Sequence, residues 1–316
     1  MEDLIMKYGV ALGKRYTLKQ RQRFLLTLND EFSALGYQTR FANNAKKRNA
    51  RAVNLFIGDL AKADIVICTH HDTPQKVFWP NFRYYPLNGK RNFTNLTLIT
   101  FIPAVFSSLI GALTIYYLIN NLALGGYWYQ ILLFVVVALS FVFASLLTIG
   151  VSNKYNLNRN TASVTVLLET AKNLSKKAKN KVAFILLDKA CSNNSGTQML
   201  HQALPKTLDR KLFVYLDCVG NGDNLVVAYK EHLRKECQKL IRNFKGTQTA
   251  SIVELDEAET VYTPAFFLRR SIVITNGKFD KKHNLYVDKV NSNKDRYVDI
   301  PTLEALVAML TKSFDQ

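Results

Sequence analysis

The chain has 316 residues, of which 48% are hydrophobic, and its 42 Lys and Arg residues exceed its 24 Asp and Glu residues to give a net charge of +18. This composition excludes a disordered, collagen-like or disulfide-framework protein, and the length allows one large or two ordinary domains. A strongly basic chain is typical of proteins that bind nucleic acid or an anionic membrane surface. The charge is unevenly distributed, because the 62 residues from 92 to 153 contain no Asp, Glu, Lys or Arg.

The first 91 residues predict the beginning of an α/β domain. Apolar residues at helical spacing indicate an amphipathic helix over Leu18–Leu35, which ends at Gly36. Two strands are expected at Tyr37–Phe41 and Ala52–Ile57, separated by a basic turn at residues 46–51. Ala63–Cys68 is a short β-branched run typical of a buried strand.

The uncharged block contains two apolar runs, Leu96–Ile119 and Ile131–Gly150, each of which has the roughly 20 residues that a membrane-spanning helix needs. An Asn- and Gly-containing segment with three aromatic residues, 120–130, predicts a turn at a membrane interface. The alternative is a pair of buried core helices in a soluble protein. We interpret the block as a transmembrane helical hairpin.

The cations beside the hairpin predict its orientation. Lys90 and Arg91 precede it, Lys154 and Arg159 follow it, and the connecting turn carries no cation. The positive-inside rule then places both termini and the globular domain in the cytoplasm of a two-pass cell-membrane protein. The four cysteines fall in this cytoplasmic portion and need no disulfide there.

Strands continue to alternate with helices after the hairpin, which favours a mixed, mostly parallel sheet with helices on both faces. The expected strands are Val182–Leu187, Leu212–Leu216, Leu225–Tyr229 and Ile272–Thr275, and the expected helices are Ala162–Leu174, Glu231–Phe244 and Pro301–Ser313. We expect one domain, formed by residues 1–91 and 154–316 and interrupted by the hairpin at residues 92–153.

Polar residues follow three of the buried strands, in the segments 69–73, 188–192 and 217–220. In open α/β sheets, ligands and catalytic groups gather beyond the carboxyl ends of the strands. The first segment reads Thr-His-His-Asp-Thr, and His and Asp side chains are common zinc ligands.

The order of these motifs resembles metallopeptidase family 28, the co-catalytic zinc aminopeptidases. The resembling segments are the His-x-Asp-Thr strand end at 70–73, the helix start at 158–164, the strand at 182–188 followed by Gly196-Thr197, the strand end at 215–220, and the segment 290–299 before the last helix. The resemblance runs from about Leu35 to the end of the chain and implies the aminopeptidase fold.

The resemblance implies a site that has lost most of its catalytic residues. His70 matches the first zinc ligand, Asp72 the carboxylate behind it, and Asp217 another ligand. Arg159 replaces the bridging Asp, Ala190 and Cys191 replace the general-base Glu and the adjacent ligand Glu, and Asn291 replaces the final ligand His. A two-metal hydrolase needs the bridging carboxylate and the base.

We therefore predict a former active site without metal, in which the Arg159 guanidinium neutralises a carboxylate. Two alternatives remain open. His70, Asp217 and Cys191 could hold one zinc ion, or Cys191 could act as a nucleophile with His70 as its base. His71, His201, His232 and His283 are expected to be structural or surface residues.

The expected function is a catalytically inactive, aminopeptidase-like binding or accessory subunit of a membrane complex. Its predicted partners are membrane lipids and a membrane protein, with no cofactor. The basic segments, such as residues 175–181, accompany no nucleic-acid-binding motif, so no nucleic acid is expected. The competing hypothesis is a metal-dependent peptidase or amidohydrolase with a rebuilt zinc site. The hairpin enters beside the predicted site, which should place the strand ends near the membrane.

Overall fold

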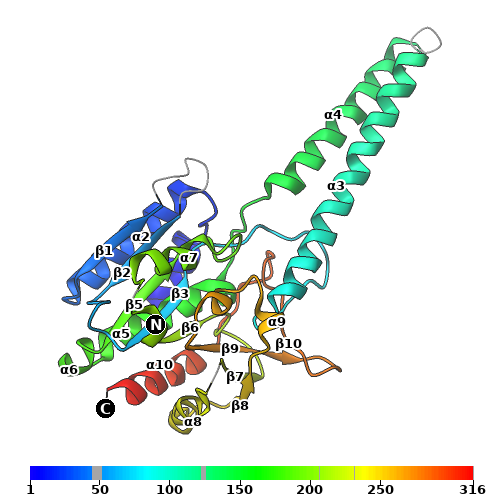
Figure 1. Cartoon of the computed structure of the whole chain (residues 1–316). Helices are drawn as coiled ribbons and strands as arrows, with labels where there is room; N and C mark the ends of the chain where they lie inside the picture. Colours follow the sequence, from blue (N-terminus) through cyan, green and yellow to red (C-terminus); the bar gives the residue numbers. More distant parts are fainter. Residues whose placement is uncertain (45–51, 122–125, 206, 231, 316) are drawn as a thin grey trace.

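The computed structural model describes residues 1–44, 52–121, 126–205, 207–230 and 232–315. The basic turn expected at 46–51 and the centre of the turn expected between the apolar helices, 122–125, lie outside the described residues. The described part forms a domain built on one sheet, and a helical hairpin projects from it (Figure 1).

The sheet has ten strands in the described residues, and its centre is parallel. Neighbouring strands follow the order β1 (Thr39–Asn43), β2 (Val53–Ile57), β5 (Val182–Leu187), β3 (Ile65–His70), β6 (Leu212–Leu216), β9 (Ser271–Phe279), β10 (Leu285–Asp288) and β4 (Arg83–Tyr84), while β7 (Asn224–Tyr229) pairs with both β9 and β8 (Thr249–Glu254). Strands β5, β3, β6 and β9 run parallel, and β1, β2, β7, β10 and β4 add antiparallel pairs. The predicted mixed α/β sheet is confirmed.

Helices cover both faces of the sheet, as predicted. One face packs against α2 (Leu18–Ala34), α5 (Ala162–Asn173), α8 (Arg234–Asn243) and α10 (Ile300–Phe314) in the larger hydrophobic core. The other face packs against α7 (Ser195–Ala203) and the short η4 (Pro264–Phe267). The apolar β5 sequence Val-Ala-Phe-Ile-Leu-Leu is buried at every residue because it lies between these two layers.

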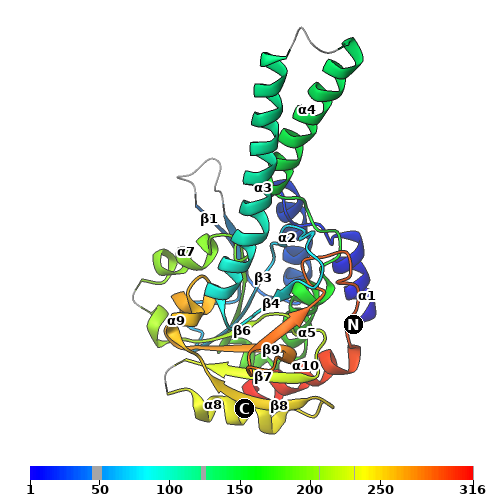
Figure 2. The same ribbon diagram turned by 90° about the vertical axis from the view of Figure 1, so that its right-hand side faces the viewer.

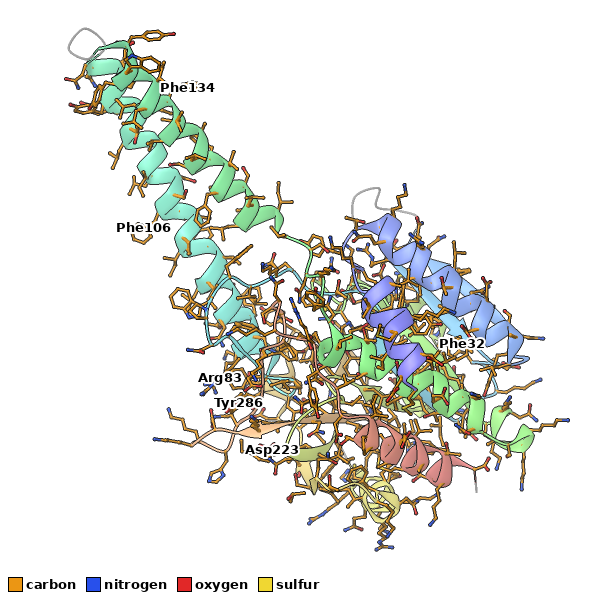
Figure 3. The ribbon with its side chains drawn as sticks, turned by 180° about the vertical axis from the view of Figure 1, so that it is seen from behind. Phe32, Arg83, Phe106, Phe134, Asp223 and Tyr286 are labelled. Carbon is orange, nitrogen blue, oxygen red and sulfur yellow. The ribbon has the colours of Figure 1, made fainter. Side chains whose placement is uncertain are left out.

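The hairpin consists of α3 (Gly89–Asn120) and α4 (Tyr127–Ile149), which pack together along their length and extend away from the domain (Figures 1 and 2). Both helices are long and apolar enough to cross a membrane, and only 17% and 11% of their most apolar stretches are buried. Phe106 and Phe134 show this exposure on the outside of the hairpin (Figure 3). The alternative of two buried core helices therefore disagrees with the structure.

The helices of the hairpin meet through small residues. Ala104, Ser107 and Gly111 of α3 are buried, as are Ser140 and Ala144 of α4. The hydroxyl of Ser107 donates a hydrogen bond of 2.8 Å to the carbonyl oxygen of Ser140. Small residues let two helices approach closely enough for such bonds.

Several predicted boundaries were wrong. Helix α3 begins at Gly89, because Asn88 caps it before the apolar run starts. Residues 127–129 form the first turn of α4 instead of the connecting turn. Strand β3 continues through His70, so this histidine is the last residue of the strand. The helix expected from Glu231 begins at Arg234.

Some elements were not predicted from the sequence. They are α1 (Glu2–Ile5), η1 (Met6–Ala11), α6 (Lys176–Lys179), α7, η3 (Leu208–Arg210), α9 (Glu257–Thr260), η4 and the strands β4, β8 and β10. The two residues of β4 become a strand only by pairing with β10. Short edge strands have too few residues to show a period, and long-range pairing decides whether they form.

Candidate functional site

The candidate site lies where the central strands end. His70 ends β3, Asp217 follows β6, and Cys191 lies in the turn after β5. These strands are parallel neighbours, so their carboxyl ends meet at one edge of the sheet. Arg159 comes from η2 (Leu157–Thr161), the short π-helical turn that leads into α5.

The Arg159 guanidinium occupies the centre of the site. Its Nη1 pairs with Asp217 Oδ1 and lies 2.8 Å from His70 Nε2, and its Nη2 lies 3.0 Å from the Tyr84 hydroxyl. The same guanidinium stacks over the Tyr84 ring, 4.1 Å from the centroid. Tyr84 in turn donates to Asp217 Oδ2 at 2.8 Å. Arg159 and Asp217 form this ion pair with side chains that are only 4% and 2% exposed.

Burial and charge act in opposite directions on this ion pair. Burial alone would raise the pKa of Asp217, but Arg159, His70 and Tyr84 lower it below its usual value. Burial alone would lower the pKa of Arg159, and Asp217 raises it well above its usual value. Both groups are therefore charged at neutral pH, and each provides the partner that makes burial of the other tolerable.

The proton on His70 is located by its neighbours. Burial and Arg159 lower the pKa of His70, but the carboxylates of Asp217 and Asp72 raise it, and the pKa lies well above its ordinary value. Nε2 lies 2.8 Å from Arg159 Nη1, and this N–H donor opposes a second proton on the ring. Nδ1 lies 2.8 Å from the carbonyl oxygen of Asp72 and 3.3 Å from its carboxylate. Nδ1 therefore carries a proton, which it donates to Asp72.

Asp72 connects His70 to the turn after β5. Its carboxylate accepts hydrogen bonds from the backbone N–H groups of Ala190 at 3.2 Å and Cys191 at 3.0 Å. The same carboxylate lies 3.3 Å from His70 Nδ1. Ala190 contributes only its backbone to these contacts, and its methyl group can neither accept nor donate a proton.

Cys191 is the half-exposed thiol of the site. Its Sγ lies 3.6 Å from His70 Nδ1 and 3.7 Å from Arg159 Nη2. Cys191 therefore lies beside His70 and Arg159, two residues of the predicted site. Its backbone N–H donates to the Asp72 carboxylate. Cys218, whose Sγ lies 3.8 Å from Arg159 Nη1, is fully buried beneath the same guanidinium.

Three residues that contact the site were not predicted from the sequence. Tyr84 belongs to the two-residue strand β4, which has no pattern of its own. Asn160 donates to the backbone oxygen of His70. Asp295 accepts from the N–H groups of Asn158 at 2.8 Å and Arg159 at 3.1 Å, and so holds η2 in place. Burial raises the pKa of Asp295 to about 7.

A second buried arginine lies behind the site. Arg15 is fully buried, stacks 4.3 Å over the Phe24 ring and donates to the Thr161 hydroxyl at 3.0 Å. Burial lowers its pKa to about 9, although Asp72 opposes this effect. Nothing in the local sequence 13–16 distinguishes this cation from the surface lysines, so sequence reasoning did not find it.

The remaining histidines agree with their expected roles where the structure describes their contacts. His71 is buried on the other side of β3, with Nε2 2.9 Å from the Val53 carbonyl oxygen and 3.7 Å from Asp188. His201 is exposed, and its Nε2 lies 2.9 Å from the carbonyl oxygen of Phe267.

A cavity of about 320 Å³, lined mainly by residues of polar type, opens beside these residues, and we call it the headward cavity. Its lining comprises Tyr16, Arg21, Asp72, Thr73, Pro74, Gln75, Leu96, Lys189, Cys191, Ser192 and Asn291. Asn291 stands where the family resemblance places a ligand His. Its side-chain oxygen is buried and has no hydrogen-bond partner among the described residues.

The backbone around the cavity is strained. Lys189, Cys218 and Asn291 adopt left-handed conformations with φ of 60°, 54° and 57°. Such conformations are uncommon for residues other than glycine and cluster at functional sites. Lys189 and Asn291 belong to the lining of the cavity, and Cys218 lies beneath the Arg159 guanidinium.

The described residues do not fit a two-zinc centre. Arg159 Nη1 takes up the lone pairs of His70 Nε2 and Asp217 that would bind a metal. His70, Asp72 and Cys191 do place ligand atoms within 4.8 Å of one another. However, both Asp72 oxygens already accept backbone N–H groups, and the cationic Arg159 lies 3.7 Å from the Cys191 sulfur. A dication bound there would be repelled by this guanidinium.

No protein-family model and no curated protein matches the sequence. Solved structures do share the fold. A Zn-dependent exopeptidase from Parabacteroides distasonis is 14% identical with a TM-score of 0.56, over 97% of this chain and 94% of that chain. A glutaminyl cyclase from Tannerella forsythia is 12% identical with a TM-score of 0.59, over 98% and 96% of the two chains. A leucine aminopeptidase precursor from Bacteroides thetaiotaomicron is 13% identical with a TM-score of 0.55, over 99% and 95%. These likenesses show that the chain has the fold common to zinc exopeptidases and glutaminyl cyclases.

Proposed function

We propose that this chain is a two-pass membrane protein whose peptidase-like domain binds a ligand or partner without hydrolysing it. In this role it serves as a binding or accessory subunit of a membrane complex. The observation that carries the proposal is the position of Arg159, whose guanidinium lies between His70 and Asp217.

Loss of catalysis follows from two features of the site. Activation of a water molecule for peptide hydrolysis needs a metal or a general base near the reacting carbonyl. Arg159 contacts His70 and Asp217, the side chains that would ligate a metal. Ala190 occupies the position at which the resembled family has its general base. The cation also balances the buried charge of Asp217, so the site is stable without metal.

Membrane insertion explains the exposed apolar surface of the hairpin. In water, two helices with this much uncovered apolar surface would be an aggregation hazard. Tyr127 and Trp128 are 74% and 80% exposed at one end of the hairpin, where aromatic residues suit an interface. Lys90, Arg91 and Lys154 lie at the other end, which supports a cytoplasmic domain.

A metal-dependent peptidase or amidohydrolase is the second candidate. The observation that favours it is the close group formed by His70, Asp72 and Cys191, whose ligand atoms lie within 4.8 Å of one another. Zinc would be its cofactor, and binding would require the Asp72 carboxylate to give up its backbone hydrogen bonds to Ala190 and Cys191.

Metal analysis combined with turnover assays separates the two candidates. The full chain, purified in a mild detergent, is analysed for zinc and assayed with aminopeptidase substrates and with an N-terminal glutaminyl peptide. We expect much less than one zinc per chain and no turnover. Stoichiometric zinc, with turnover that His70→Ala abolishes and His201→Ala leaves unchanged, would overturn the proposal. His201 is a suitable control because it is exposed and distant from the Arg159 contacts.

A subunit role predicts a stable protein partner. Affinity purification of the full chain from its own membranes, after cross-linking, should recover a stoichiometric membrane protein. Recovery of the chain alone at every detergent and cross-linker concentration would remove the accessory-subunit part of the proposal.

A further inference from the structure

A second cavity lies against the base of the hairpin, and we call it the tail cavity. It has a volume of about 230 Å³ and is almost wholly apolar. Its lining comprises Ile99, Thr100 and Pro103 of α3, Phe143, Leu146 and Leu147 of α4, Gly150, and residues 75–79. Two of these, Phe78 and Trp79, are each 59% exposed. The tail cavity therefore lies where the chain passes from the domain into the apolar hairpin.

The headward and tail cavities are adjacent. Gln75 lines both of them, and along α3 Leu96 of the headward cavity precedes Ile99 of the tail cavity by one helical turn. At their boundary, the Tyr16 hydroxyl donates to the Ile149 carbonyl oxygen at 2.6 Å. A Cβ added to Gly150, whose φ is 81°, would lie 2.4 Å from Gln75 Oε1 and 2.5 Å from the Tyr16 hydroxyl. The backbone thus passes very close to the residues that separate a polar from an apolar space.

The cations around the polar space outnumber the carboxylates, since Arg15, Arg21 and Lys189 face Asp72 and Asp188. Arg21 and Lys189 line it, and Arg15 is buried nearby. The Asp72 carboxylate, which also lines it, is occupied by two backbone N–H groups. Arg21 is partly neutralised by Asp188 at 2.9 Å, so Lys189 supplies charge on this side. Lys76 adds a further cation from the tail cavity, where its amine lies 4.9 Å over the Phe78 ring.

We propose that one anionic phospholipid binds across the two cavities, with its phosphate headgroup in the headward cavity and an acyl chain in the tail cavity. This inference rests on the membrane insertion of the hairpin proposed above and specifies the ligand of the same site. The Lys189 amine would face the phosphate, and a headgroup hydroxyl would donate to the buried Asn291 side-chain oxygen, which has no partner among the described residues. A ligand with one polar and one apolar part matches the two linings.

The tail cavity favours an acyl chain over a peptide. A peptide backbone brings N–H and C=O groups that need hydrogen-bond partners in an apolar space. The hydroxyl of Thr100 already donates to the Leu96 carbonyl oxygen at 2.6 Å. The remaining side chains that α3 and α4 contribute are hydrocarbon, which suits a chain of methylene groups. A lipid can also enter sideways from the bilayer, whereas a soluble anion would leave the tail cavity unfilled.

Native mass spectrometry of the full chain in a mild detergent tests this proposal. The probes are dioleoyl phosphatidylglycerol, dioleoyl phosphatidylcholine and soluble glycerol 3-phosphate. We expect one phosphatidylglycerol per chain to persist under collisional activation that removes other lipids, with several-fold weaker retention of phosphatidylcholine. Ile99→Trp, which fills the tail cavity, should lower retention about tenfold. Leu98→Trp is the matched control, because Leu98 is 50% exposed and does not line the cavity.

A charge variant tests the headward cavity. Ser192→Asp places a carboxylate on its lining and should lower phosphatidylglycerol retention about tenfold, while the neutral Ser192→Asn should not. Quenching gives an independent readout for chains that dissociate in the spectrometer. Trp79 and Trp128 are the two tryptophans of the chain, so in Trp128→Phe a stoichiometric brominated phosphatidylglycerol should quench Trp79 fluorescence. Ile99→Trp cannot be used in that assay, and Ile99→Phe replaces it.

Three outcomes would overturn the lipid proposal. Equal losses of phosphatidylglycerol retention in Ile99→Trp and Leu98→Trp would show that the lipid is bound only loosely around the hairpin. Binding of glycerol 3-phosphate as tightly as the lipid, unaffected by Ile99→Trp, would show a soluble-anion site. A peptide retained in place of lipid would show a peptide groove. Failure of membrane insertion itself is measured separately, by release of the chain into the supernatant at alkaline pH.

Discussion

Arg159 and Asp217 form an ion pair in which both side chains are almost fully buried, although they come from η2 and from the end of β6. The Tyr84 hydroxyl forms hydrogen bonds with both partners, since it accepts from Arg159 and donates to Asp217. Since His70 also lies within hydrogen-bond distance of the guanidinium, one cation organises the polar residues at the strand ends.

Breaking this pair from one side should be costly. Arg159→Met leaves a buried carboxylate without its partner, and Asp217→Leu leaves a buried guanidinium, so each should lower the free energy of unfolding by about 3–5 kcal/mol. The double variant should lose much less unfolding free energy than the sum of the losses in the two single variants, because no uncompensated charge remains. Denaturant unfolding in detergent measures all three chains. Additive losses would show that the two side chains contribute independently.

The buried carboxyl of Asp295 should make stability depend on pH. Its pKa is raised from 3.8 to about 7 by burial, so the unfolded chain releases this proton at a lower pH than the folded chain. Its contribution is therefore fully present below about pH 4 and is lost as the pH rises through 7, a difference of about 4 kcal/mol.

Asp295→Asn should flatten the fall in stability between pH 4 and 7. The exposed Asp209→Asn is the control and should leave the profile unchanged. Thermal unfolding across this pH range provides the measurement. A profile for Asp295→Asn that parallels the unmodified chain would show that Asp295 titrates normally in the folded protein.

Close packing of the hairpin should depend on Gly111. A Cβ at this position would lie 3.3 Å from the Ser140 Cβ and 3.4 Å from the Phe141 ring. Gly111→Val should push the helices apart, weaken the Ser107–Ser140 hydrogen bond and destabilise the hairpin by about 1–3 kcal/mol. The neighbouring Ala112 is exposed, so Ala112→Val is the matched control. Thermal unfolding in detergent should separate the two, and equal midpoints would argue against a close Gly111 contact.

Membrane orientation can be measured by thiol labelling. In intact cells a membrane-impermeant maleimide should label Gly126→Cys, next to the connecting turn. Lys177→Cys, in the basic segment after α5, should be labelled only after the cells are permeabilised. The unmodified chain gives the background from the native cysteines. Labelling of Lys177→Cys in intact cells would reverse the proposed orientation.

The local sequence pattern was sufficient to predict the buried strands and the amphipathic helices. It was also sufficient to predict the carboxyl ends of the strands, at which ligands gather. β3, β5 and β6 are short β-branched or apolar runs, and the residues after them, including Asp72 and Asp217, were identified from position alone. The ion-pair partner Arg159 came from the family resemblance. The partners from other elements could not be found this way, because Tyr84, Asp295 and Arg15 reach the site through long-range packing.

The sequence by itself determined that a chain with net charge +18 contains a 62-residue uncharged segment able to form two long apolar helices, since length and hydrophobicity are local properties. Only the tertiary structure decided that Arg159 lies between His70 and Asp217 and that a polar and an apolar cavity meet at Gln75. Both relationships depend on how η2, the strand ends and the base of the hairpin pack in space, and no spacing along the chain encodes those distances.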